Sequence, residues 1–143
     1  MKRMNGKFFL DTNVFVDSFD EVPGSKARGA TQLIRQAIST RKGIISYQVV
    51  QEFFNVARRR FERPMSVEDA EQYLAAVLRP LLVVHSSPAL FSEALQIAGR
   101  HSVSWYDSLI VAAALQAQCE VLYSEDFQHG QKFGKLEIRN PFL

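Results

Sequence analysis

Short apolar runs alternate along the chain with longer segments of helical periodicity. Five of these runs are typical of buried strands, and they lie at residues 7–10, 43–46, 81–84, 120–123 and, with a weaker pattern, 136–139. Helical patterns separate the first four runs. Strands that alternate with helices predict an α/β domain with three layers, in which helices flank a mostly parallel sheet of four or five strands.

The helical segments carry apolar residues at three- and four-residue spacing, which predicts amphipathic helices over residues 27–38 and 49–57. Ser66 with Asp69 resembles a capping box in which Asp replaces the usual Glu or Gln, and Pro88 suits a first helical turn. Residues 107–117 are apolar on most sides, which predicts a buried helix. The side chains expected to be buried include Leu33, Ile34, Phe53, Phe54, Leu109, Ile110 and Leu122.

The composition fits one ordinary domain over residues 1–143. With 47% hydrophobic residues, a chain of 143 residues can bury about two-thirds of its unfolded surface without a disulfide or a structural metal. The single cysteine, Cys119, permits neither an internal disulfide nor a cysteine-based zinc site, which favours a reducing cytoplasm. No run approaches the ~18 to 20 apolar residues of a membrane span, and nothing resembles a signal peptide, so no membrane association is expected.

The net charge of +2 is too small to indicate a nucleic-acid binder by itself. Basic residues gather at 58–63, at 41–42 and at 132–139. For any one group a solvated face is the better interpretation. Phosphate contact gains support only if an acidic metal site accompanies these groups.

Four acids follow strands or border apolar helices. Asp11 comes directly after the first apolar run, and Asp126 lies just past the fourth. Glu52 lies at the border of the apolar arc of its helix, and Asp107 opens the buried helix. Since ligands of open α/β sheets collect at the carboxyl ends of strands, these side chains could share one site.

Each acid also has a purely structural interpretation. Asp11 could cap a short helix, Asp107 could be a first-turn acid favoured by the helix dipole, Glu52 could lie on the surface, and Asp126 could belong to a turn. For Asp107 taken alone, the structural interpretation is the better one. If the four converge, their mutual repulsion requires a cation, and hard oxygen ligands without a His or Cys cluster select Mg²⁺ or Mn²⁺.

Four segments resemble, in order, the motifs of PIN-domain nucleases. They are FLDTNV (residues 9–14), SYQVVQEF (46–53), WYDSLIVAAA (105–114) and LYSEDF (122–127). No single motif is specific, but the ordered set is a strong signal, and it covers essentially the whole chain. The small size is most similar to that of VapC-type toxins of bacterial toxin-antitoxin pairs.

The resemblance implies that Asp11, Glu52 and Asp107 are the main metal ligands, and that Asp126 completes the site or holds a second ion. It further implies that Asn13 and Ser124 hydrogen-bond the acids or the metal's water. The activity implied is that of a metal-dependent endoribonuclease that leaves a 5′ phosphate and a 3′ hydroxyl. The implied partners are RNA, a second copy of the chain in a homodimer, and a cognate antitoxin that directs an Arg or Lys at the carboxylates.

Other residues carry weaker signals. His85, His101 and His129 show no ligand spacing and are expected to be structural or superficial, although His129 is close enough to Asp126 in sequence to line the cleft. Trp105 and Tyr106 could stack an RNA base, but packing at the entry to the buried helix is the favoured interpretation. The acidic patch of Asp17, Asp20 and Glu21 is expected to be solvated and could receive a basic partner segment.

Rival functions leave different signatures. A receiver-type phosphoacceptor domain would have adjacent acids at its first strand, where Asp11 stands alone, and an Asp-x-Asp phosphatase would need an acid where Asn13 stands. DNA nucleases of the flap type share the PIN fold but carry large insertions, for which this chain has no room. The serious alternative is a catalytically silent PIN-fold module that binds RNA or protein, and the presence of all four acids argues against it.

Overall fold

A computed structural model of the chain describes residues 6–143. Its strands are β1 (Phe8–Leu10), β2 (Gly43–Ser46), β3 (Leu82–Val84), β4 (Val121–Tyr123), β5 (Lys132–Phe133) and β6 (Leu136–Arg139). They form one sheet in the order β3-β2-β1-β4-β6-β5, in which only β5 runs antiparallel to its neighbour. The five predicted strands are confirmed to within one residue. The short β5 gave no pattern in the sequence, and it pairs with β6 through a tight turn in which Gly134 has a φ of 61°.

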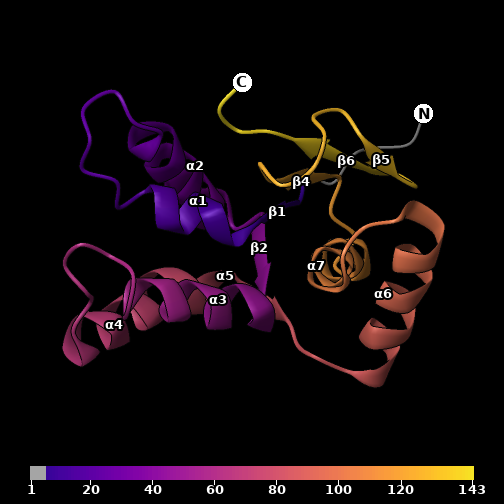
Figure 1. Cartoon of the computed structure of the whole chain (residues 1–143), viewed down its shortest axis with the longest axis horizontal. Coiled ribbons are helices and arrows are strands. Elements are labelled where there is room, and N and C mark those ends of the chain that lie inside the picture. Colours follow the sequence, from indigo (N-terminus) through magenta and orange to yellow (C-terminus); the bar gives the residue numbers. More distant parts are fainter. Residues whose placement is uncertain (1–5) are drawn as a thin grey trace.

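The helices are α1 (Thr12–Asp17), α2 (Ala27–Thr40), α3 (Tyr47–Ala57), α4 (Val67–Tyr73), η1 (Leu74–Leu78), α5 (Arg79–Leu81), α6 (Pro88–His101) and α7 (Trp105–Gln116). The segment η1 is a π-helical turn between α4 and α5. Figure 1 shows α6 and α7 on one side of the strands and α1 to α5 on the other, which confirms the three layers. None of the helices within residues 6–143 combines the length and the apolar character that a membrane span requires.

Serine side chains fix where several helices begin. Ser66 caps α4 by accepting a hydrogen bond from the backbone N of Asp69 at 3.1 Å, as the capping pattern predicted. Pro88 is the first residue of α6. Ser104 caps α7 through the backbone N of Asp107 at 3.2 Å, so this helix begins two residues earlier than the apolar pattern predicted. Because Ser104 supplies the cap, the carboxylate of Asp107 is not needed for that role.

The core lies between the sheet and its two helical layers. Five of the seven side chains predicted to be buried are buried, whereas Leu33 and Phe54 are only half-buried. The buried stripe of α2 runs through Ala30, Ile34 and Ala37, and that of α3 runs through Val49, Phe53 and Ala57. Leu33 and Phe54 each lie next to a stripe residue in sequence, about 100° around the helix, and therefore at the edge of the buried face.

The strand order decides where the acids emerge. β1 lies between β2 and β4 and is parallel to both, with Phe8 in register with Gly43 on one side and Val121 on the other. The carboxyl ends of the three strands therefore open at the same edge of the sheet. Asp11 follows β1, α3 follows β2, and the segment of Ser124 follows β4. This edge is the place where a ligand site is expected in such a sheet.

Candidate active site

Asp11 is a buried acid with two hydrogen-bond donors. It caps α1, and its side chain is only 4% exposed. Oδ1 accepts a hydrogen bond from the backbone N of Thr12, and Oδ2 accepts one from the hydroxyl of Ser124, both at 2.7 Å. Burial and, to a smaller extent, the charges of Asp126 and Glu52 raise the pKa of Asp11 to about 7, although these two hydrogen bonds lower it. Asp11 is therefore a helix cap and also a carboxyl group that is costly to ionise.

Glu52 reaches Asp11 through Thr12. The Thr12 hydroxyl donates a hydrogen bond to Oε1 of Glu52 at 2.8 Å, while the Thr12 backbone N binds Asp11. Glu52 is half-buried on α3, consistent with its place at the border of the apolar arc. The patterns in the sequence did not predict this role of Thr12. The signal available was its position inside the segment Asp-Thr-Asn, next to the first acid.

Asp126 and Asp107 form the other half of the site. The side-chain amide of Asn13 donates to Oδ1 of Asp126 at 3.2 Å, and the backbone N of Asp126 donates to the Ser124 hydroxyl at 3.1 Å. Burial raises the pKa of Asp126, and the charge of Asp107 is the next largest cause of this rise. Asn13 and Ser124 thus hydrogen-bond acids of the site, and Asp107 at the start of α7 influences Asp126 electrostatically.

The four acids lie along one edge of the sheet and influence one another electrostatically in pairs. Asp126 and Glu52 each raise the pKa of Asp11, and Asp107 raises that of Asp126. Within the described part of the chain, no three acidic, histidine or cysteine side chains lie close enough together to hold an ion as they stand. The donors fit Mg²⁺ or Mn²⁺ in their chemistry, because all are carboxylate oxygens. Side-chain rotations would have to draw them together around an ion.

A second group of charges borders the site. Asp17 is half-buried, and its Oδ2 is buried without a hydrogen-bond donor among residues 6–143. Burial and then a hydrogen bond with Glu125 raise the pKa of Asp17 to about 7, and the same bond lowers the pKa of Glu125. Lys26 forms an ion pair with Glu125. The prediction of a solvated acidic patch is therefore wrong for Asp17, although Asp20 and Glu21 are exposed.

The histidines have structural contacts. His85 and His101 pack edge-on against aromatic rings, with ring centroids 4.3 and 4.8 Å apart. Nδ1 of His129 accepts a hydrogen bond from the backbone N of Asn140 at 3.0 Å. These contacts confirm the structural interpretation of all three histidines.

The two aromatic residues at the start of α7 differ from each other. Trp105 packs against Phe91 of α6, with ring centroids 6.3 Å apart, and is 38% exposed. Tyr106 is 65% exposed. Packing at the entry to the helix was the favoured prediction for both residues. It holds for Trp105 and is wrong for Tyr106.

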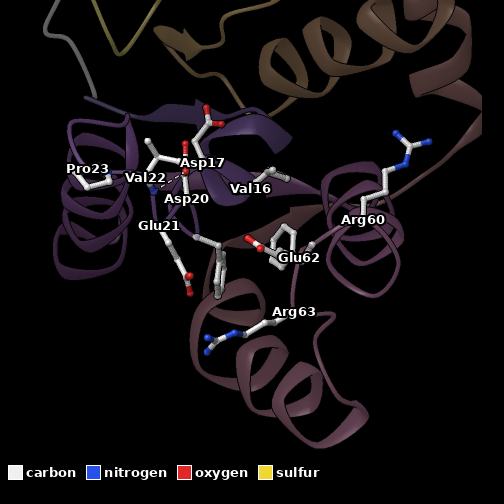
Figure 2. Close-up of a pocket in the computed structure, with 11 residues that line it drawn as sticks. Val16, Asp17, Asp20, Glu21, Val22, Pro23, Arg60, Glu62 and Arg63 are labelled. Carbon is white, nitrogen blue, oxygen red and sulfur yellow. Dashed lines mark hydrogen bonds between the residues drawn. The ribbon is translucent and has the colours of Figure 1, made fainter.

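A groove of about 620 Å³ lies between the α1–α2 loop and the segment after α3, and none of the four acids lines it. Figure 2 shows that acidic side chains, including Asp20 and Glu21, come from the first of these segments, and Arg60 and Arg63 from the second. Phe19 lines the groove and packs against the ring of Phe61 with centroids 5.2 Å apart. The groove therefore combines an aromatic floor with one acidic rim and a second rim of mixed charge, in which Glu62 lies between Arg60 and Arg63.

Solved structures with the same fold are known from several bacteria. A toxin-antitoxin complex from Klebsiella pneumoniae matches with a TM-score of 0.69 and 16% identity, over 94% of this chain and 98% of that chain. VapBC2 from Rickettsia felis, bound to a DNA fragment from its promoter, matches with a TM-score of 0.65 and 14% identity, over 92% and 96%. The sarcin-ricin loop cleaving toxin VapC20 from Mycobacterium tuberculosis matches with a TM-score of 0.60 and 20% identity, over 84% and 90%. At these identities the likeness shows the fold.

Comparison with the curated proteins gives no match. The sequence profile of the PIN domain matches residues 8–132, a range that includes Asp11, Glu52, Asp107 and Asp126. This match spans most of the 143 residues and agrees with the mostly parallel sheet between two layers of helices. The chain belongs to the PIN domain family.

Proposed function

We propose that the chain is a metal-dependent endoribonuclease and the toxin of a toxin-antitoxin pair. The observation that carries the proposal is that four acids which influence one another electrostatically lie at one edge of the sheet, one of them buried with its pKa raised to about 7. Crowded carboxylates without a countercharge are costly, and a divalent cation removes that cost. Mg²⁺ or Mn²⁺ would be held by Asp11, Glu52, Asp107 and Asp126.

The bound ion would polarise the scissile phosphate and lower the pKa of a water molecule. The oxygen of that water forms a bond to phosphorus, the bond from phosphorus to the 3′ oxygen breaks, and a proton passes to the leaving oxygen. The products carry a 5′ phosphate and a 3′ hydroxyl. The protein's part is to fix its carboxylates: Ser124 holds Asp11, and Thr12 holds Glu52.

An antitoxin is the partner that the groove between the α1–α2 loop and the segment after α3 would suit. The aromatic floor favours apolar anchors, and the two charged rims favour a segment that carries both signs. The solved structure from Klebsiella pneumoniae is a toxin-antitoxin complex, which supports the same kind of partner here. Arg63→Glu on the rim should weaken co-purification with the product of the neighbouring gene, whereas Arg100→Glu at the end of α6 should not. If no small partner is encoded or co-purified, the toxin role fails and the nuclease role stands.

A second copy of the chain, in a homodimer, is a further partner that we propose. Val83 on the edge strand β3 and Leu95 on α6 are apolar and mostly exposed, at 54% and 62%. Sedimentation of the purified chain over a range of concentrations would detect a dimer. A monomer at every concentration would reject it.

The nuclease proposal is tested by cleavage of single-stranded RNA, structured RNA and single-stranded DNA in Mg²⁺, Mn²⁺ or EDTA. Asp107→Asn should lower RNA cleavage by orders of magnitude, because water activation and phosphate polarisation both depend on the ion. The wild type should gain thermal stability with Mn²⁺ by mass action, and Asp107→Asn should largely lose that gain. A chain that binds RNA but cleaves nothing under any of these conditions would instead support the silent module.

Asp69→Asn is a matched control for Asp107→Asn. Both acids are the third residue of a helix, and the backbone N of each donates to a serine cap. Both substitutions therefore lose the same favourable interaction with a helix dipole, about 0.3–1 kcal/mol. Of these two acids, Asp107 alone raises the pKa of Asp126. Neutralising Asp107, but not Asp69, should therefore relieve repulsion in the metal-free protein. Asp69→Asn should keep both the metal-dependent shift and the cleavage.

A further inference from the structure

Tyr106 presents its side chain to solvent at the start of an otherwise buried helix. From Ser108 to Ala114 every residue of α7 is buried, whereas Tyr106 is 65% exposed. The ring of the preceding residue, Trp105, packs on Phe91 of α6. Among residues 6–143, no ring contact of this kind involves Tyr106. The structure therefore leaves one large aromatic surface open directly before Asp107.

The backbone of Tyr106 is fixed to the helix that carries Glu52. Nε2 of Gln48 donates a hydrogen bond to the carbonyl oxygen of Tyr106 at 3.1 Å. Gln48 and Glu52 are four residues apart on α3, so they lie on the same face of that helix. The bond thus joins the first turns of α3 and α7. It holds the backbone of Tyr106, the residue directly before Asp107, against the helix that carries Glu52. This restraint reduces the entropy lost when a ligand binds the ring.

We propose that Tyr106 is a stacking platform for one base of the RNA, next to the phosphate that is cleaved. The inference rests on the proposed function and names a substrate contact of that same site. Exposed aromatic rings are the usual stacking surface for unpaired bases, because every base offers a π-face. The carboxylates repel the RNA backbone, so a contact to the base adds affinity that charge attraction does not supply at this edge.

A second copy of the chain could also cover an exposed tyrosine, and the test must separate the two occupants. A protein interface would lose affinity between copies when the ring is removed. A base platform would lose affinity for RNA, and only when the stacked base is present. The experiment therefore changes the ring and the base together, as a double-mutant cycle.

The assay measures kcat/KM on a single-stranded RNA oligonucleotide whose cleavage site has been mapped with the wild type. A series of substrates replaces one nucleotide at a time by an abasic ribonucleotide. Tyr106→Ala should lower kcat/KM on intact RNA about five- to 150-fold, the loss expected when one stacking partner of a base is removed. The loss should lie mainly in KM. At one abasic position the wild type should show a similar loss, and Tyr106→Ala should add little to it.

Three variants keep the outcome interpretable. Tyr106→Phe and Tyr106→Trp retain a ring and should keep most of the activity on intact RNA. Val67→Ala removes an apolar side chain of similar exposure, 61%, on α4 and should leave kcat/KM unchanged. Tyr106→Ala should keep the wild-type shift of melting temperature with Mn²⁺, which shows that the acids are intact.

These measurements distinguish a failure of the proposed nuclease function from a failure of the Tyr106 platform. If the wild type cleaves no RNA, the proposed function fails, and this inference fails with it. If the wild type cleaves RNA but Tyr106→Ala loses the same factor on every abasic substrate, or loses nothing, the platform is rejected and the nuclease stands. A change in sedimentation without a change in kcat/KM assigns the ring to an interface between copies and also rejects the platform.

Discussion

Asp11→Asn is the sharpest test of how the site is held in the metal-free protein. The carboxyl group is buried, and its pKa is raised from 3.8 to about 7. Because the folded-state pKa lies above the unfolded one, the bound proton stabilises the fold fully below about pH 4. That stabilisation is lost as the pH rises through about 7. Asn is neutral at every pH, so it should remove this dependence.

The shift of about three pKa units corresponds to about 4 kcal/mol between the fully protonated and the fully ionised site, at 1.36 kcal/mol per unit. Integrated from about pH 5 to about pH 8, this one group should cost the wild type about 2 to 3 kcal/mol of unfolding free energy. An Asn at this position can accept the Thr12 backbone hydrogen bond and donate to the Ser124 hydroxyl, so the local bonds survive.

The measurement is urea unfolding in EDTA at several pH values, with the wild type and Asp11→Asn in parallel. The difference between the two proteins cancels the contributions of other groups, including Asp17, whose pKa is also raised. The unfolding free energy of Asp11→Asn, relative to that of the wild type, should increase as the pH rises. Saturating Mn²⁺ should reverse the trend for the wild type alone. A difference that is independent of pH would refute the argument from burial.

Three further predictions concern single contacts. Ser124→Ala removes the hydroxyl that donates to Asp11, so the unfolding free energy should fall by about 1–3 kcal/mol in urea titration at neutral pH. Gly43→Ala would place a Cβ 2.1 Å from the Cβ of Ala37, so overpacking of α2 on β2 should lower the unfolding free energy by about 1–3 kcal/mol or more in the same assay. Burial raises the pKa of the Cys119 thiol to about 12, so iodoacetamide should alkylate it far more slowly in the folded protein than in urea; equal rates would contradict its burial.

The local patterns of the sequence were enough to predict most elements of the fold, although not β5. The runs at 43–46 and 136–139 became β2 and β6 without a change of bounds. β2 is buried along its whole length, as in a sheet covered on both faces, whereas β6 alternates between buried and more exposed residues. The capping role of Ser66 followed from residues three apart. The four ordered motifs predicted the PIN family, which the match over residues 8–132 confirms. All of these signals lie within a few positions along the chain.

The contacts inside the site were decided by tertiary structure alone. Thr12 binds Glu52 across 40 residues, and Ser124 binds Asp11 across 113 residues. Contacts over such separations produce no periodic pattern in the sequence. Such pairs exist because β1 lies between β2 and β4, an order that depends on which strand edges meet in the folded chain.

The exposure of residues at the start of a helix likewise depends on which neighbours pack against them. The apolar run of α7 predicted its burial, yet Trp105 reaches a ring of α6 while Tyr106, one residue further along, faces solvent. Hydrophobicity along the chain determined which side chains could be buried on folding. The neighbours that the fold supplied determined which of them did, because burial requires a partner surface as well as an apolar side chain.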